Sequence, residues 1–317
     1  MKLFPSQAVA LGALLLAAPA FAQVGPDVIY GSDDRLDLYQ VQNTRLLEAA
    51  DSTVALFSAG DVSVAGNRAN LSVSHYGRGM SLCTDEPFYD QVNGAFCSGS
   101  LVAPDVIMTA GHCVRSESAC QGTKFVFGFG VKSQGVMPSS VGADDVYSCK
   151  KLIAQTLVGN GADFALIRLD RPVTGRAPLR FNRGGDPANG TPLVVIGHPA
   201  GLPTKIAGGA KVRDASPNGY FVANLDTYGG NSGSAVFNAT NLVIEGILVR
   251  GENDYVWRGS CRVSQQCADD ACRGEDVTKM TSVLPSLPGT AGEAAASYVV
   301  RPETVLSTLK TALESNP

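Results

Sequence analysis

Charged side chains are scarce in this chain. They make up 17% of its 317 residues, below the roughly 25% of an average globular protein, and the formal net charge is only -4. No stripe of Lys and Arg occurs anywhere along the chain. Because nucleic-acid binding requires clustered cations that displace counterions from phosphates, this composition argues against a nucleic-acid-binding function.

Long apolar runs are also lacking. An eleven-residue apolar run over residues 8–18 follows Lys2 and precedes the small-residue pattern Ala20-Phe21-Ala22. That run is too short to span a bilayer, and no later segment reaches the roughly 18 apolar residues of a transmembrane helix. We therefore expect a signal peptide over residues 1–22, a secreted or periplasmic location and no membrane anchor.

The chain has no pattern typical of a metal or nucleotide site. The cysteines Cys261, Cys267 and Cys272 are not spaced as CxxC and have no His nearby, which disfavours zinc. Neither a GxxxxGK[ST] loop nor a helix-opening GxGxxG is present. We expect no metal and no cofactor. The eight cysteines instead predict up to four disulfides in an oxidising compartment.

The middle of the chain contains no convincing helical run of 10 to 15 residues. Short segments rich in Val, Ile, Phe and Leu alternate there with Gly, Pro, Asn and Asp, which favours all-β barrels or sandwiches over alternating helices and strands. The predicted strands are 53–57, 100–102, 106–109, 125–129, 165–169, 193–196, 221–224, 234–237 and 243–249.

Helical spacing is confined to the two ends. Residues 33–50 have apolar side chains near helical spacing and contain no Cys, as in a pro-segment or an N-terminal arm. Residues 302–315 begin with Pro302 and predict an amphipathic terminal helix, with 285–296 as its linker.

Histidine is the rarest residue with acid–base chemistry, since only three occur. His112 follows an apolar strand and precedes Cys113, a residue that a disulfide could anchor. These neighbours should hold His112 in a fixed position. His75 and His198 are flanked by turn residues and are more simply interpreted as loop residues. His112 is therefore the candidate general base.

Ser232 is the candidate nucleophile. It lies in the glycine-rich stretch 226–234, where the backbone can turn tightly and direct amides toward an oxyanion. A glycine-rich turn without a catalytic role is the alternative. The Gly-x-Ser-x-Gly elbow of lipases does not fit, because Ser234 occupies the fifth place.

Asp163 completes the set of candidates. It opens an apolar run, and a carboxylate buried there needs a partner, which His112 would supply. The alternative is an Asp held by turn amides at a strand entry. The chain order is His, Asp, Ser.

The stretches 97–113, 163–166 and 230–234 resemble, in this order, chymotrypsin-fold (trypsin-like) serine proteases, nearest to the bacterial glutamyl-endopeptidase-like branch. The likeness covers roughly residues 70–283 and implies an all-β fold of two six-stranded antiparallel β-barrels, here with a C-terminal helix. The predicted division is a signal peptide (1–22), a pro-segment or arm (23–68), a protease domain (69–283) and a linker with a helix (284–317).

The resemblance also implies roles for individual residues. His112 would be the general base and acid, Asp163 the orienting carboxylate and Ser232 the nucleophile of a serine endopeptidase that forms an acyl-enzyme. The amides of Gly230 and Ser232 would form the oxyanion hole. A disulfide between Cys97 and Cys113 is implied, while the pairing of the other six cysteines stays open. The partners would be protein or peptide substrates, and we expect a monomer.

Specificity is predicted from three residues. Asp226 lies six residues before Ser232, where trypsin-like enzymes have the floor of the primary pocket, so Arg or Lys is expected before the scissile bond. Arg250 and Glu275 fall in the segments that resemble the pocket walls. Broad or acidic specificity is one alternative, and a catalytically silent or latent binding protein on a protease scaffold is the other.

Asn231 marks a departure from the family pattern. Vertebrate trypsins have an Asp before the nucleophile, which captures the new N-terminal ammonium on activation. Asn231 has no charge for that ion pair, so activation by this route is not expected.

Overall fold

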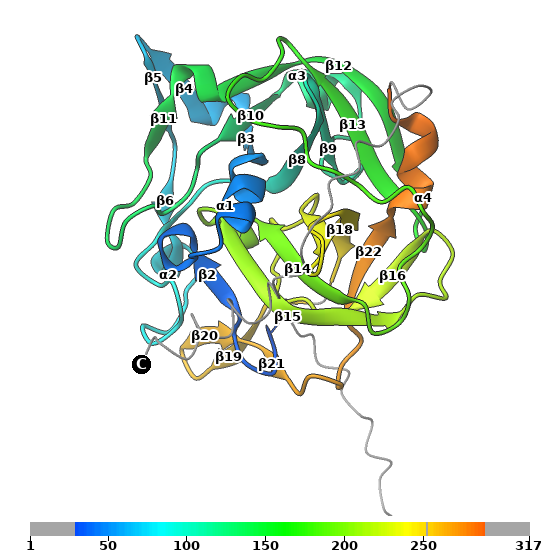
Figure 1. Ribbon diagram of the computed structural model, residues 1–317. Coiled ribbons are helices and arrows are strands. Elements are labelled where there is room, and N and C mark those ends of the chain that lie inside the picture. Colours follow the sequence, from blue (N-terminus) through cyan, green and yellow to red (C-terminus); the bar gives the residue numbers. More distant parts are fainter. Residues whose placement is uncertain (1–28, 252, 289–317) are drawn as a thin grey trace, which may run out of the picture.

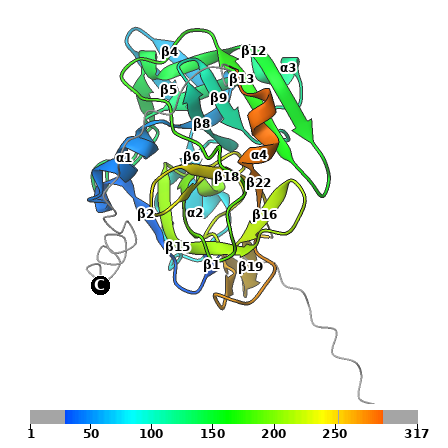
Figure 2. The same ribbon diagram turned by 45° about the vertical axis from the view of Figure 1, so that its right-hand side comes forward.

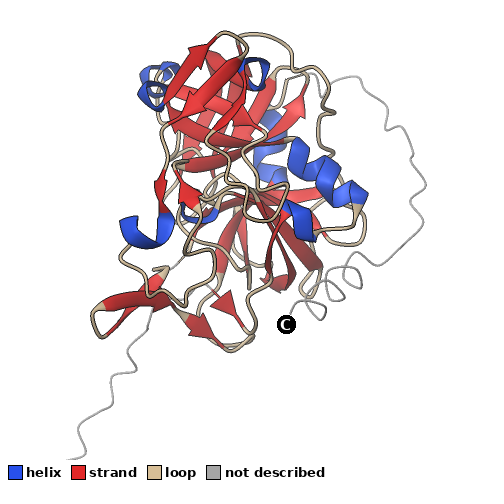
Figure 3. Ribbon diagram, turned by 90° about the vertical axis from the view of Figure 1, so that its left-hand side faces the viewer, coloured by secondary structure: helices blue, strands red, loops and turns tan. Residues whose placement is uncertain are grey.

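The structure is a computed structural model that describes residues 29–251 and 253–288. Strands dominate this part of the chain and its helices are short (Figures 1 and 3). The predicted signal peptide and the predicted helix at 302–315 lie outside the described residues. No helix within the described ranges is long and apolar enough to cross a membrane.

Six antiparallel strands close the first barrel, in the order β10-β12-β13-β9-β8-β3. Strand β3 completes it, because it pairs with β8 on one edge and with β10 on the other. Alternate side chains such as Leu56, Leu101 and Ile107 fill the interior and are fully buried. The bounds are β3 Thr53–Ser58, β8 Cys97–Ala103, β9 Val106–Thr109, β10 Thr123–Phe127, β12 Val146–Leu157 and β13 Asp163–Leu169.

The position of β3 corrects the predicted domain boundary. This strand lies inside residues 23–68, the range expected to be a pro-segment or arm. Since β3 is hydrogen-bonded on both edges, the first barrel begins before residue 69. Residues 62–71 also contain strands, β4 Val62–Ala65 and β5 Arg68–Leu71, which form a separate sheet with β11 Ser140–Gly142.

The second barrel also has six strands, in the order β14-β17-β18-β22-β16-β15. Pairing of β14 with β15 closes it, and strand β2 Arg35–Asp37 adds to β15 from outside. Both barrels of the predicted fold are therefore present. The bounds are β14 Pro192–Gly197, β15 Lys205–Asp214, β16 Tyr220–Ala223, β17 Ala235–Asn238, β18 Ile244–Arg250 and β22 Glu275–Lys279.

The N-terminal segment follows the second barrel before it enters the first. Strand β1 Ile29–Tyr30 pairs in parallel with β21 Gln266–Cys267, and β2 is followed by a 3-10 turn. The α-helix predicted within 33–50 is limited to α1 Thr44–Asp51, which the Asn43 side chain caps. Pairing with β15 holds residues 35–37 extended, so tertiary contacts override the local helical spacing there.

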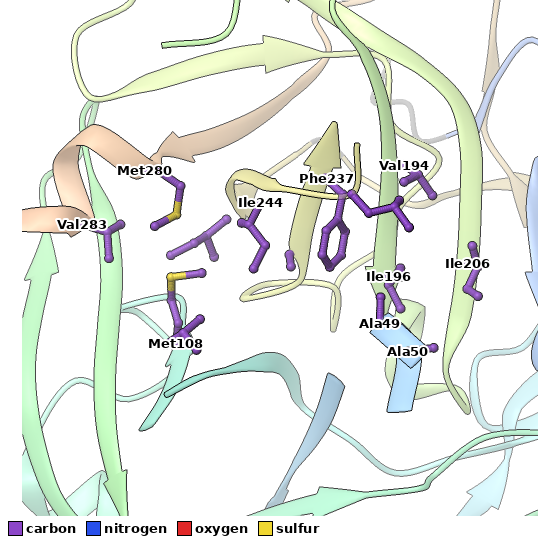
Figure 4. Packing of buried hydrophobic residues seen from close by; sticks show 14 of the residues in the cluster. Ala49, Ala50, Met108, Val194, Ile196, Ile206, Phe237, Ile244, Met280 and Val283 are labelled. Atoms are coloured by element: carbon purple, nitrogen blue, oxygen red, sulfur yellow. The ribbon is translucent and has the colours of Figure 1, made fainter. Parts of the chain in front are cut away.

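A shared apolar core fixes the two barrels against each other. Met108 of the first barrel, Phe237 and Ile244 of the second, and Val283 of helix α4 Met280–Val283 belong to one buried cluster (Figure 4). Helix α1 lies between the barrels in Figures 1 and 2 and adds Leu46, Ala49 and Ala50 to this cluster. Burying each large apolar side chain stabilises the fold by about 1.5–3 kcal/mol.

Shorter elements and disulfides complete the molecule. The remaining elements are β6 Ser74–His75, β7 Val92–Asn93, β19 Tyr255–Arg258, β20 Cys261–Ser264, α2 Tyr76–Gly79 and α3 Glu117–Gln121, with 3-10 turns at Leu38–Gln40, Ala59–Asp61, Ala143–Asp145, Pro199–Gly201 and Leu284–Ser286. All eight cysteines form disulfides: Cys83–Cys261, Cys97–Cys113, Cys120–Cys149 and Cys267–Cys272. The pair Cys97–Cys113 is the one that the resemblance implied.

Candidate active site

His112 and Asp163 form a hydrogen-bonded pair at the end of the first barrel. Nδ1 of His112 lies 2.7 Å from Oδ2 of Asp163, and the backbone N–H of His112 donates to Oδ1 at 3.1 Å. The carboxylate thus holds both the ring and the backbone of the histidine. With the proton on Nδ1, Nε2 has the lone pair that can accept a proton.

Two structural features hold the His112–Asp163 pair in place. A side chain on Gly111 would come within 2.2 Å of the Thr156 carbonyl, so only glycine lets the turn before His112 pack here. Thr278 of the second barrel clamps the backbone of Asp163: its Oγ1 accepts from the Asp163 N–H at 3.0 Å and donates to the Asp163 carbonyl at 2.9 Å.

Ser232 reaches the same place from the second barrel. Its carbonyl accepts from the N–H of Ser98 at 2.8 Å and lies 3.6 Å from Sγ of Cys113, the neighbour of His112. Gly233 packs so closely on the first barrel that a Cβ there would be 2.1 Å from the Ser98 carbonyl. The half-buried Ser232 hydroxyl makes no hydrogen bond within the described residues. Hydrogen bonds of catalytic groups are often long or poorly aligned when no substrate is bound.

The predicted oxyanion-hole amides lie in one tight turn. Gly230 has φ of +93°, a left-handed conformation that favours glycine. In the described part of the chain, the N–H groups of Gly230 and Ser232 donate to no protein acceptor, although their neighbours Asn231 and Gly233 do. Two such amides can both donate to an anionic oxygen.

A cavity of about 460 Å³ lies beside Ser232. Arg250 and Glu275 line it, and so do Tyr228, Asp254, Arg262 and other residues that the sequence did not single out. Asp254 sits in the irregular segment after β18, where no sequence pattern pointed to a site. Its Oδ2 accepts from the N–H of Gly229 at 2.9 Å, and burial raises its pKa to about 6.

Glu275 is the most deeply buried acid of this cavity. Its side chain packs on Gly251, where a Cβ would meet Oε2 at 1.8 Å. Within the described residues Oε1 has no hydrogen-bond partner. Burial, followed by repulsion from Asp254, raises the pKa of Glu275 well above its ordinary value. A buried carboxyl in this state gains free energy when a cation comes within reach.

Arg250 is already paired. Its Nε lies 2.9 Å from Oδ2 of the buried Asp276, and another guanidinium nitrogen donates to the Gly161 carbonyl at 2.9 Å. The Arg250 charge is therefore balanced by Asp276 and leaves the acids of the cavity without a cationic partner from this side chain.

Asp226 is not among the residues that line this cavity. Its carboxylate accepts from the N–H of Tyr30 and from the N–H of Asp34, both at 2.8 Å, and is almost completely buried under the N-terminal segment. Burial is also the main reason that the pKa of Asp226 is raised well above its ordinary value. The structure thus separates Asp226 from Arg250 and Glu275, with which the sequence grouped it.

The other histidines have structural surroundings. His198 is fully buried, its Nδ1 lies 3.0 Å from the Leu202 carbonyl, and burial lowers its pKa to about 4. His75 caps helix α2 by accepting from the N–H of Arg78. Within the described residues, neither imidazole ring hydrogen-bonds to His112, Asp163 or Ser232.

Comparison with known proteins agrees with this geometry. The family described as "Trypsin-like peptidase domain" matches residues 97–244, which contain His112, Asp163 and Ser232. Residues 97–244 are therefore similar to a trypsin-like peptidase domain. Trypsin of Sarcophaga bullata is 33% identical over 116 residues, 35% of this chain and 42% of that protein. The chymotrypsin-like elastase family member 3B of Macaca mulatta is 35% identical over 82 residues, 25% of this chain and 32% of that protein.

The matched segments thus span less than half of either relative. Among solved structures, an inactive serine-to-alanine form of Rv3671c from Mycobacterium tuberculosis is 14% identical with a TM-score of 0.44, covering 84% of this chain and 100% of that chain. A Glu endopeptidase in complex with MPD is 19% identical with a TM-score of 0.46, covering 81% and 96% of the two chains.

Proposed function

We propose that this protein is a secreted serine endopeptidase. The observation that carries the proposal is the meeting of the His112–Asp163 pair with Ser232 at the junction of the two barrels, inside the trypsin-like domain. No cofactor is needed for the chemistry that these groups can perform.

In the proposed reaction, Nε2 of His112 takes the hydroxyl proton of Ser232 as Oγ bonds to the carbonyl carbon of the substrate. The electron pair of the C=O bond moves to the oxygen, where the amides of Gly230 and Ser232 donate to it. The imidazolium, stabilised by Asp163, then protonates the leaving amine as the C–N bond breaks. Water attacks the resulting acyl-enzyme by the same steps and regenerates Ser232.

We further propose that the substrate has Arg or Lys before the scissile bond, and that Glu275 attracts it, with Asp254 contributing to the field. Both acids line the cavity next to Ser232, whereas Asp226 is occupied by backbone amides of the N-terminal segment. A substrate cation would give Oε1 of Glu275 a hydrogen-bond partner.

The test is fluorophosphonate labelling of the full exported protein, with the modified residue mapped and turnover measured on a mixed peptide library. We expect label on Ser232 and loss of both label and turnover in Ser232→Ala, whose melting temperature should stay near that of the wild type. Peptidase activity that survives in Ser232→Ala would refute the assignment. A folded wild type with neither label nor turnover would support the silent binding protein instead.

A further inference from the structure

Ser98 holds the turn of Ser232 at two points. From strand β8 of the first barrel, its N–H donates to the carbonyl of Ser232 at 2.8 Å and its Oγ donates to the carbonyl of Gly230 at 2.8 Å. Ser98 is fully buried. One residue therefore holds the carbonyls of the two residues whose amides are proposed to form the oxyanion hole.

The direction of the side-chain bond follows from its neighbours. The backbone N–H of His198 donates to Oγ of Ser98 at 2.9 Å, so the hydroxyl oxygen is an acceptor on that side. Since the carbonyl of Gly230 can only accept, the hydroxyl proton of Ser98 must point to it. Ser98 thus links the 198–201 turn to the Gly230 turn by two hydrogen bonds of its hydroxyl group.

Gly230 is held from its other side as well. The carbonyl of Gly229 accepts from the N–H of Ala200 at 2.6 Å, and the N–H of Gly230 points the opposite way because the peptide between them is trans. A Cβ on Gly230 would be 2.7 Å from the carbonyl of His198, so a larger residue would not fit at this position. Ala200 itself has φ of +51°, an uncommon conformation for alanine.

We propose that Ser98 is a positioning residue for the oxyanion hole. With its hydroxyl present, Ser98 holds the carbonyl of Gly230 while Ala200 holds that of Gly229, so the amides of Gly230 and Ser232 keep the relative orientation in which both can donate to the oxyanion. Without the hydroxyl, the peptide after Gly230 can rotate, which would shift the Ser232 N–H relative to the Gly230 N–H and misalign the two donors. The inference rests on the proposed peptidase function, because an oxyanion hole has a role only in acyl transfer.

The experiment compares Ser98→Ala and Ser98→Thr with the control Ser100→Ala. Ser100 lies two residues along the same strand, is fully buried, and has a hydroxyl without a hydrogen-bond partner among the described residues. We expect Ser98→Ala to lower kcat roughly 10- to 100-fold with KM nearly unchanged, since the hole acts mainly on the transition state. Ser98→Thr, which retains a hydroxyl, should restore part of kcat, and Ser100→Ala should leave kcat unchanged.

A peptide aldehyde provides the second readout, because its adduct with Ser232 places an oxyanion in the hole. Its Ki should rise in Ser98→Ala by about the factor lost in kcat. Melting temperatures identify any variant that is merely unfolded, and Ser98→Gly removes the same hydroxyl should Ser98→Ala not fold.

Two results would overturn the inference alone: an active wild type with kcat of Ser98→Ala equal to that of Ser100→Ala, or a loss confined to KM and melting temperature. A wild type that neither turns over peptides nor takes the fluorophosphonate label would overturn the proposed function and this inference together.

Discussion

Single side chains decide what the cavity beside Ser232 can attract. Glu275 and Asp254 both line it, and burial is the first cause of the raised pKa of each. Two arginines line the same cavity, but Arg250 is paired with Asp276 and Arg262 donates to the carbonyl of Met80. The raised pKa values show that burial outweighs the nearby arginines at both acids, whereas both oxygens of Asp226, the acid that sequence position favoured, accept from amides of the N-terminal segment.

The first prediction separates the two acids. Glu275→Gln keeps the shape of the side chain but removes its charge, so kcat/KM for a peptide with Arg before the scissile bond should fall roughly 100-fold. The value for a peptide with an apolar residue there should change little. Asp226→Asn is the matched variant and should leave the Arg preference intact. Steady-state kinetics with both peptides measure this, and a loss of Arg preference only in Asp226→Asn would return the role to Asp226.

The second prediction concerns pH. Because the pKa of Asp254 is raised to about 6, this acid gains its charge as the pH rises through 6, and burial also raises the pKa of Glu275 well above its ordinary value. The kcat/KM for an Arg peptide should therefore rise more steeply with pH than that for an apolar peptide, whose profile reports the catalytic groups alone. In Asp254→Asn the two profiles should converge near pH 6. Parallel profiles in the wild type would rule out a titrating cavity.

At the scale of elements, the N-terminal segment is part of the second barrel's surface. Strand β2 pairs with β15, and β1 pairs with β21. Arg35 is nearly fully buried there, paired with Asp33, and its guanidinium lies 4.1 Å from the ring centre of Tyr228. A second buried pair, between Lys205 and Asp37, joins the same strands. These contacts hold residues 29–43 firmly against the second barrel.

The third prediction concerns Asp34, an acidic residue of the same segment that lies near Asp33 and Asp269. Burial, followed by repulsion from Asp33 and Asp269, raises the pKa of Asp34 from 3.8 to about 6. The folded state thus binds this proton more tightly than the unfolded state does. The stabilisation is present below pH 3.8 and is lost as the pH rises through about 6. Asp34→Asn should remove that component, so its melting temperature relative to the wild type should increase from pH 4 to pH 7. A constant difference would contradict the assignment.

At the scale of the whole molecule, the site exists only where the two barrels meet. His112 and Asp163 come from the first barrel and Ser232 from the second, and the shared core holds them in place. Thr278 links the two barrels directly. Its side chain on β22 of the second barrel forms hydrogen bonds with the backbone of Asp163 in the first barrel.

A fourth prediction tests that link. Thr278→Val leaves two buried backbone groups of Asp163 without their partner and should destabilise the protein by about 1–3 kcal/mol. It should also lower kcat, because the His112–Asp163 pair loses its support. The control is Thr53→Val, which removes a buried hydroxyl bonded to the Ala49 carbonyl. Urea unfolding and kinetics together distinguish the cases: both variants should lose stability, but only Thr278→Val should lose kcat.

Much of the fold could be read from local pattern. The nine predicted strands all fall on observed ones, such as 106–109 on β9 and 193–196 on β14, because apolar β-branched runs between turn residues are a local signal. Strand β15 was missed, since its Gly and Lys residues break that pattern, although pairing on both sides holds it extended. The boundary at residue 69 was too late, because no local feature marks β3 as a barrel strand.

The sequence by itself determined the chemistry that is available: one braced histidine, one acid at a strand entry and one serine between glycines, each set by its immediate neighbours. Only the tertiary structure decided which acids face the cavity and that Ser98 contacts the turn of Gly230. Such choices depend on residues far apart in the chain, as Asp226 with Tyr30 and Glu275 with Gly251 show. Burial and pairing are properties of the packed barrels, so no local pattern records them.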